Sequence, residues 1–131
     1  MNFLSPMLKL VKNMAKNENS TRAFSDKQEK YICKLLGGQQ VNNSGAGLFK
    51  KGDVVVPSAS LLVECKCQMS EKQSYSVKKE VILKNFSEAF ANRLNNSCMC
   101  FNFGPDSENY FVISEKLMKF LVKKLSEEED D

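Results

Sequence analysis

The chain has 131 residues and a formal net charge of +3, with 19 basic and 16 acidic side chains and no histidine. Hydrophobic residues make up 42% and charged residues 27%, as is typical of a single globular domain. The absence of histidine excludes His-based acid–base catalysis, Ser-His-Asp and Cys-His nucleophiles, and His-containing zinc or haem sites. Any catalysis must therefore use carboxylates, lysine, cysteine or tyrosine.

The charge is divided unevenly along the chain. Residues 126–131 hold five acidic side chains, so residues 1–125 carry a net charge of +8. We expect an acidic disordered tail over 126–131 and a basic body. A basic body favours a polyanionic partner such as nucleic acid, although lysine-rich faces can also serve solubility alone. Two of the 19 basic residues are arginines, which favours phosphate contacts over base reading.

The cysteine count and the hydropathy pattern indicate the cellular compartment. Five cysteines are an odd number, and no secretory signal is visible. No run reaches the ~18 apolar residues of a membrane span. We therefore expect a reduced intracellular protein, cytoplasmic or nucleoid-associated, without a membrane partner.

Residues 1–23 are expected to form an N-terminal arm or short helix. Ser25 and Gln28 match a capping box, which predicts a helix from Ser25 to the glycines at 37 and 38. Its apolar stripe comprises Ile32, Leu35 and Leu36. Glu29 falls on the same inward side, which is unusual for a carboxylate.

A hairpin follows, with strands over 53–56 and 61–67 and a turn over 57–60. Antiparallel pairing across a four-residue loop places Asp53 opposite Glu64, with Lys66 further along the same face. Directly opposed residues have Cβ atoms about 4.5–5.5 Å apart, so a divalent cation would relieve the repulsion of the two carboxylates. The alternative is an exposed strand face with a cross-strand ion pair.

The second half predicts a helix over 76–95, strands over 98–103 and 110–113, and a helix from Ser114 to residue 125. The order of helix, hairpin, helix, hairpin and helix predicts an α/β domain over 24–125. The expected inward residues are Ile82, Leu83, Phe86, Phe90 and Leu94 in the first of these helices, and Leu117, Leu121 and Leu125 in the second.

Two further groups have alternative interpretations. The pairs Cys65-x-Cys67 and Cys98-x-Cys100 could bind zinc as four thiolates, but strand thiols more often pack in a core, which we favour. The aromatic residues are expected in the core or a dimer interface rather than in a base-stacking platform; they are Phe86, Phe90, Phe101, Phe103, Tyr110 and Phe111.

Gly52-Asp53, ten intervening residues and then Glu64-Cys65-Lys66 resemble the D…E-x-K signature of the PD-(D/E)XK nuclease superfamily. Glu29 on the preceding helix, the Gly/Ser-rich turn, the hairpin, the long helix and the next strand match that family's αβββαβ order. The resemblance implies a restriction-endonuclease-like core, with a mixed central sheet flanked by helices.

Within the superfamily, the chain is most similar to archaeal-type and viral Holliday junction resolvases. The similarity rests on Gln28-Glu29-Lys30, Asn43-Ser44-Gly45 and Ser76-Val77-Lys78-Lys79. The chain departs from the family at Asn43, where arginine often precedes the serine, and at Gly52, where proline usually precedes the aspartate. Lys50 or Lys51 could replace the missing arginine.

The resemblance implies a role for each matched residue. Asp53, Glu64 and the Cys65 backbone carbonyl would hold Mg²⁺ or Mn²⁺, and Lys66 would orient water and stabilise negative charge. Glu29 would be a further ligand, direct or through water, or would orient Lys66. Phosphate contacts would come from Ser44, Lys50, Lys51, Lys78 and Lys79. Lys78 and Lys79 could instead form a solvated face.

We therefore expect a metal-dependent endodeoxyribonuclease acting on four-way DNA junctions in recombination and repair. Paired nicks favour a C2 homodimer, whose symmetry matches that of the junction. The alternatives are a nicking, restriction-like or recombination DNase on other DNA substrates, and a non-catalytic DNA-binding module of the same fold.

Overall fold

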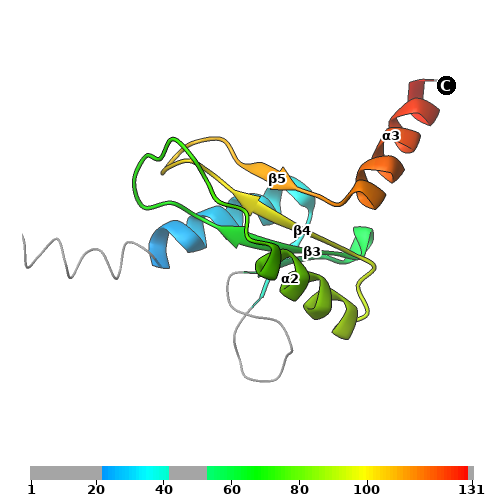
Figure 1. Cartoon of the computed structure of the whole chain (residues 1–131), viewed down its shortest axis with the longest axis horizontal. Coiled ribbons are helices and arrows are strands. Elements are labelled where there is room, and N and C mark those ends of the chain that lie inside the picture. Colours follow the sequence, from blue (N-terminus) through cyan, green and yellow to red (C-terminus); the bar gives the residue numbers. More distant parts are fainter. Residues whose placement is uncertain (1–21, 42–52, 130–131) are drawn as a thin grey trace, which may run out of the picture.

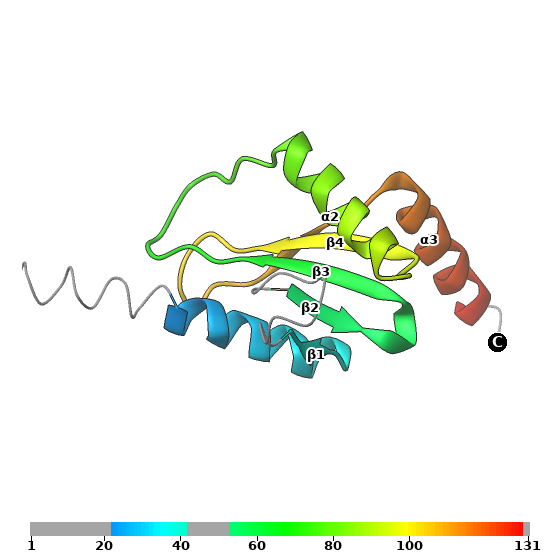
Figure 2. The same ribbon diagram turned by 90° about the horizontal axis from the view of Figure 1, so that it is seen from below.

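The computed structural model describes residues 22–41 and 53–129, which form a sheet between two helical layers (Figure 2). This arrangement confirms the α/β class and the mixed sheet that the sequence predicts. In chain order the elements are a helix over 22–36, β1 (Gln39–Gln40), β2 (Asp53–Val56), β3 (Leu61–Lys66), α2 (Lys79–Ala91), β4 (Asn96–Phe101), β5 (Tyr110–Val112) and α3 (Glu115–Glu129).

The described strands lie in the order β1-β2-β3-β4-β5. Figure 1 labels β3, β4 and β5 side by side. The central pair, β3 and β4, is parallel, and the other neighbouring pairs are antiparallel. Parallel strands need a long crossover connection, which residues 67–78 and α2 provide. The first helix covers one face of the sheet and α2 covers the other (Figure 2).

The β2–β3 hairpin has the register that the sequence predicts. Val56 pairs with Leu61, and Asp53 pairs with Glu64. Residues 57–59 form one 3-10 turn, which suits the fixed φ of its leading proline. Ser60 closes the turn in a left-handed conformation, with φ 48° and ψ 48°. This short loop sets the strand register and therefore the pairing of the two carboxylates.

The N-terminal boundary of the first helix differs from the prediction. The helix is already formed at residue 22, so the proposed N-cap at Ser25 is wrong. The Ser25 hydroxyl instead hydrogen-bonds with the Cys67 thiol at 3.2 Å. Most of the predicted arm over 1–23 lies outside the described residues. The C-terminal end is confirmed, because Gly37 adopts the left-handed φ of 70° that favours glycine.

The first helix and the sheet share one hydrophobic core. Ile32 is fully buried and Leu36 packs against the core, as expected, whereas Leu35 is 55% exposed. The buried cluster comprises Ile32, Val54, Val56, Val63, Cys98 and Cys100. Core packing is therefore confirmed for the Cys98 and Cys100 pair.

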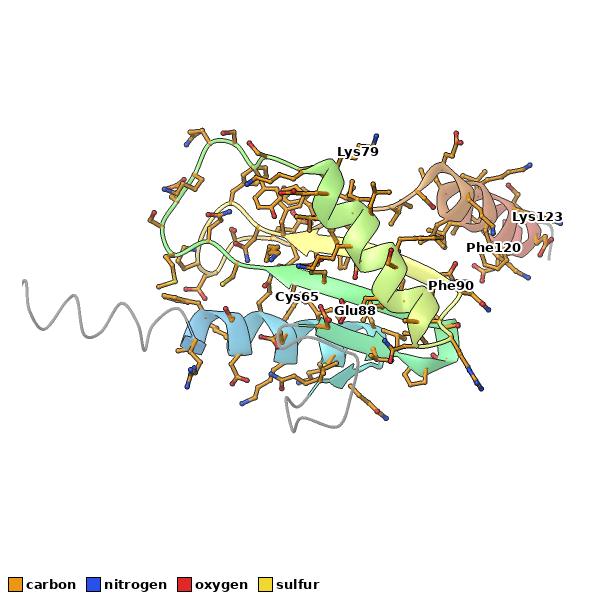
Figure 3. All side chains as sticks on the ribbon, turned by 60° about the horizontal axis from the view of Figure 1, so that its bottom comes forward. Cys65, Lys79, Glu88, Phe90, Phe120 and Lys123 are labelled. Carbon is orange, nitrogen blue, oxygen red and sulfur yellow. The ribbon has the colours of Figure 1, made fainter. Side chains whose placement is uncertain are left out.

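The predicted inward face of α2 is wrong. The helix buries Asn85 and Ala89 because Asn85 Nδ2 donates to Cys98 O at 2.9 Å and the small Ala89 permits close approach. The large apolar residues lie outward, and Phe90 is 77% exposed (Figure 3). The others on this exposed side are Ile82, Leu83 and Phe86.

Ser114 caps α3 as predicted, and its Oγ accepts the Leu117 N–H at 3.1 Å. The helix continues to Glu129, so residues 126–129 are helical rather than a disordered tail. Leu121 and Leu125 are exposed, contrary to prediction, because α3 projects beyond the sheet after β5 (Figure 1). Within residues 22–41 and 53–129, no helix is long and apolar enough to span a membrane.

Candidate active site

Asp53, Glu64 and Lys66 lie together at the open end of the β2–β3 hairpin. Asp53 and Glu64 are directly paired residues of the two strands. Lys66 follows Glu64 by two positions, which returns its side chain to the same face. The Lys66 Nζ atom lies 3.3 Å from Glu64 Oε1. The structure thus brings together three of the four predicted catalytic residues.

The three side chains differ in their access to solvent. Asp53 is 2% exposed, while the side chains of Glu64 and Lys66 are 18% and 44% exposed. Burial of a carboxylate favours its neutral form unless positive charge or hydrogen bonds stabilise the anion. Lys66 supplies positive charge to Glu64 and is itself accessible to solvent. Within the site, Asp53 is therefore shielded from solvent, whereas Lys66 is accessible to it.

Glu29 is 5% exposed, which confirms its predicted inward position on the first helix. That helix covers the face of the sheet that carries Val54 and Val63, so Glu29 approaches from the layer opposite the Glu64 side chain. The pKa of the Cys65 thiol is raised by a hydrogen bond with Cys100, by burial, and by the negative charges of Glu29 and Asp53. Cys65 itself lies between Glu64 and Lys66 in β3 and packs against the core on the opposite face of the sheet.

Asp53 and Glu64 are the two paired carboxylates that could hold a divalent cation. Among the described residues, no three cysteine, aspartate or glutamate side chains converge to hold a metal ion. Glu29 is thus not brought into one ligand group with Asp53 and Glu64. Mg²⁺ often binds proteins through one or two carboxylates while keeping several waters. Asp53 and Glu64, directly opposed on β2 and β3, are two such carboxylates.

Gln28, which the sequence assigned to helix capping, instead fixes the end of β3. Its Nε2 group donates to Lys66 O at 2.9 Å and to Asn109 Oδ1 at 3.1 Å. These bonds join the first helix to the backbone of Lys66. Gln28 also lines a cavity of about 580 Å³ between the first helix and the 102–109 loop. The cavity is separate from the carboxylates, because neither Asp53 nor Glu64 lines it.

Two of the five predicted phosphate-binding residues are described. Lys78 is the N-cap of α2 and Lys79 is its first residue, and both side chains are exposed. Their position after the 67–78 connection places them at the start of the helix that covers the Glu64 face. Ser44, Lys50 and Lys51 lie outside the described residues.

Sequence reasoning missed Tyr75, in the connection between β3 and α2. Its ring stacks on Phe101, with centroids 4.5 Å apart and an interplanar angle of 8°. Burial raises the pKa of its phenol, while the charge of Lys66 lowers it and that of Glu64 raises it. Tyr75 is brought to this site through Phe101, which pairs with Lys66 on the neighbouring strand. The signal available in the sequence was a single aromatic residue in a polar connection.

No protein-family model matches the chain, and no match is found among curated proteins or among solved structures.

Proposed function

We propose that this chain is a metal-dependent endonuclease that hydrolyses phosphodiester bonds in branched DNA, as a Holliday junction resolvase. The observation that supports this function most directly is the pairing of Asp53 with Glu64 on adjacent strands, with Lys66 on the same face. The order of a helix, three strands, α2 and β4 supports a restriction-endonuclease-like αβββαβ core. The carboxylates and the lysine supply the chemistry that a histidine-free nuclease needs.

We assign Mg²⁺, or Mn²⁺, to Asp53, Glu64 and the backbone carbonyl of Cys65. When bound, the ion supplies Lewis-acid chemistry that activates water and polarises the phosphodiester. Glu29 lies on the helix that covers the opposite face of the sheet, so it acts through water or orients Lys66.

Lys66 is the residue that contacts the scissile phosphate. Its ammonium group is partly exposed and is held 3.3 Å from the Glu64 carboxylate, so its position is set before substrate arrives. A positive charge fixed there stabilises the negative charge that develops on the phosphate oxygens during hydrolysis. It also donates hydrogen bonds that orient the attacking water.

DNA contacts come from lysines around this site. Lys78 and Lys79 are exposed at the start of α2 and act as point charges for backbone phosphates. Lysine charges recognise the phosphate backbone rather than base sequence. Binding should therefore weaken steeply as salt is raised.

Resolution of a junction requires two matched nicks, which a C2 homodimer supplies. The α3 helix exposes four apolar residues at the spacing of a helix-pair seam. They are Met118 (54% exposed), Leu121 (41%), Val122 (50%) and Leu125 (62%). An exposed apolar stripe of this kind marks an interaction surface, so we propose a second copy as its partner.

The dimer is tested by light scattering on Leu121→Asp, with the exposed Lys119→Gln as the matched control. The aspartate places an unpaired charge in the seam, so that variant should be monomeric at concentrations where the control is dimeric. A Leu121→Asp protein that remains fully dimeric would remove α3 from the interface.

The nuclease activity is tested with Mg²⁺ on a synthetic four-way junction, a matching duplex and a single strand. The junction should be cut preferentially. Asp53→Asn should lower the cleavage rate by about a thousand-fold, because it removes a ligand charge, and should leave junction binding largely intact. Asp106→Asn is the control, since this exposed carboxylate pairs with Lys27 away from the site.

Three outcomes would contradict parts of the proposal. Undiminished cleavage by Asp53→Asn would place the active site elsewhere. Preference for the plain duplex would favour a nicking or restriction-like DNase. Junction binding without cleavage, in either Mg²⁺ or Mn²⁺, would favour a non-catalytic DNA-binding module.

A further inference from the structure

A line of three paired side chains crosses the sheet beside the candidate active site. Lys66 of β3 pairs with Phe101 of β4, and Phe101 pairs with Tyr110 of β5. Paired residues on neighbouring strands project from the same face, and the strands are about 4.8 Å apart. Two aromatic side chains thus extend across the sheet from the lysine, over a span of about 10 Å.

Phe101 lies between two tyrosines. Tyr75 stacks on it at 4.5 Å with an angle of 8°, and Tyr110 stacks on it at 5.9 Å with an angle of 30°. The ring of Phe103 contacts Phe101 and Tyr110 with its edge, at 5.4 Å and 5.6 Å. We call the three stacked rings of Tyr75, Phe101 and Tyr110 the aromatic row.

The aromatic row is only partly covered. Tyr110 is 45% exposed, and Tyr75 and Phe101 are half-buried. These rings remain accessible on the same face of the sheet as Glu64 and Lys66.

The part of the connection that precedes Tyr75 is tied to the end of β4, and the Tyr75 ring itself is placed by its stacking on Phe101. The Gln68 N–H donates to Asn102 Oδ1 at 3.2 Å, and the Lys72 N–H donates to Phe103 O at 2.6 Å. The connection also passes so close to Gly104 that a Cβ there would lie 3.0 Å from Glu71 Cα. Contacts along 67–75 therefore fix the connection to the end of β4.

We propose that the aromatic row is a stacking surface for a nucleobase of the strand whose phosphate lies at Lys66, with Tyr75 as the contacting ring. This inference rests on the proposed nuclease function. Aromatic rings beside a basic group are the common means of holding unpaired nucleotides, because every base has a face that can stack. At a branch point, bases next to the cut are the ones most readily released from pairing.

The test uses four-way junctions that carry 2-aminopurine next to the branch point, with Ca²⁺ in place of Mg²⁺ so that binding is read before cleavage. Stacking on a ring quenches the fluorescence of this base analogue. Wild type and Tyr75→Phe should quench it equally, because both keep the ring. Tyr75→Leu should lose the quenching and bind the junction between about five-fold and about a hundred-fold more weakly.

Tyr31→Leu is the matched control, because Tyr31 is 56% exposed and lies on the first helix, which covers the opposite face of the sheet from Glu64. It should quench and bind as wild type does. Circular dichroism should confirm that Tyr75→Leu is folded. Undiminished quenching by Tyr75→Leu would overturn the proposal. An equal loss in Tyr75→Phe and Tyr75→Leu would also overturn it, since the hydroxyl rather than the ring would then be responsible.

The same samples separate this inference from the proposed function. If Mg²⁺ supports junction cleavage but no position near the branch point is quenched, the aromatic row is not a base site and the nuclease remains. If the base is quenched through Tyr75 and no cleavage occurs, the stacking surface stands and the nuclease proposal fails.

Discussion

Ile32 is the side chain that holds the first helix on the sheet, and its truncation tests the orientation of Glu29. It is 0% exposed and packs in the cluster with residues of β2, β3 and β4. Glu29 precedes it by three positions and therefore shares its helix face. Ile32→Ala removes three carbon atoms from this contact.

The expected loss is large because the surroundings cannot collapse into the cavity. Ile→Ala substitutions in cores cost about 2–5 kcal/mol, and the value rises with the cavity that remains. The sheet beneath Ile32 is hydrogen-bonded and cannot move to fill the cavity, so we expect the substitution to lower the free energy of unfolding by about 3–5 kcal/mol. For a domain of this size, that loss lowers Tm by roughly 10–20 °C.

Leu35→Ala is the matched control, because Leu35 lies on the same helix and is 55% exposed. It should cost at most about 1 kcal/mol. Both values would come from urea unfolding followed by far-UV circular dichroism, with unchanged m-values as the check on two-state behaviour. Equal losses for the two variants would mean that the helix is rotated, and that Glu29 does not face the hairpin.

Two further outcomes follow from local geometry and burial. Gly38→Ala should cost about 1–3 kcal/mol in urea unfolding, because a Cβ would lie 2.9 Å from Val55 O. Gly37→Asn should cost less, since asparagine tolerates φ 70°. An unfolding midpoint for Gly38→Ala equal to that of wild type would refute the close approach. Burial raises the pKa of Cys98 to about 12, so its thiol should resist alkylation at pH 8 in the native state and react in urea. Because the unfolded thiol ionises near pH 8.5, the stability from this group is present below that pH and falls as the pH rises toward 12. Rapid native alkylation of Cys98, read by mass spectrometry, would contradict its burial.

Local sequence signals determined the centre of the candidate site. Alternating side chains and a four-residue turn that begins with proline were enough to set the pairing of Asp53 with Glu64, and the structure has that register. The helix end at Gly37 and the cap at Ser114 were predictable for the same reason. Each depends on backbone geometry within a few residues, which the local sequence specifies.

Tertiary contacts decided which side of each helix is buried. The apolar spacing of α2 predicted that Phe86 and Phe90 face the core, yet the sheet accepts Asn85 and Ala89 instead. Because α2 packs closely against β4, its buried side needs a small residue and a hydrogen-bond donor for Cys98 O. The sequence of the helix does not contain the position of β4. Periodicity gives an apolar side, but it does not say whether the sheet or a second molecule covers it.

Tertiary structure also decided what surrounds the carboxylates. The sequence predicted that Glu29 faces inward, but not that it would approach from the layer opposite Glu64. Tyr75 lies beside Lys66 only because the 67–78 connection is bonded to the Asn102 side chain and the Phe103 carbonyl, more than 25 positions further along the chain. Strand register is set locally and is therefore readable from sequence, whereas contacts between layers depend on how distant segments pack.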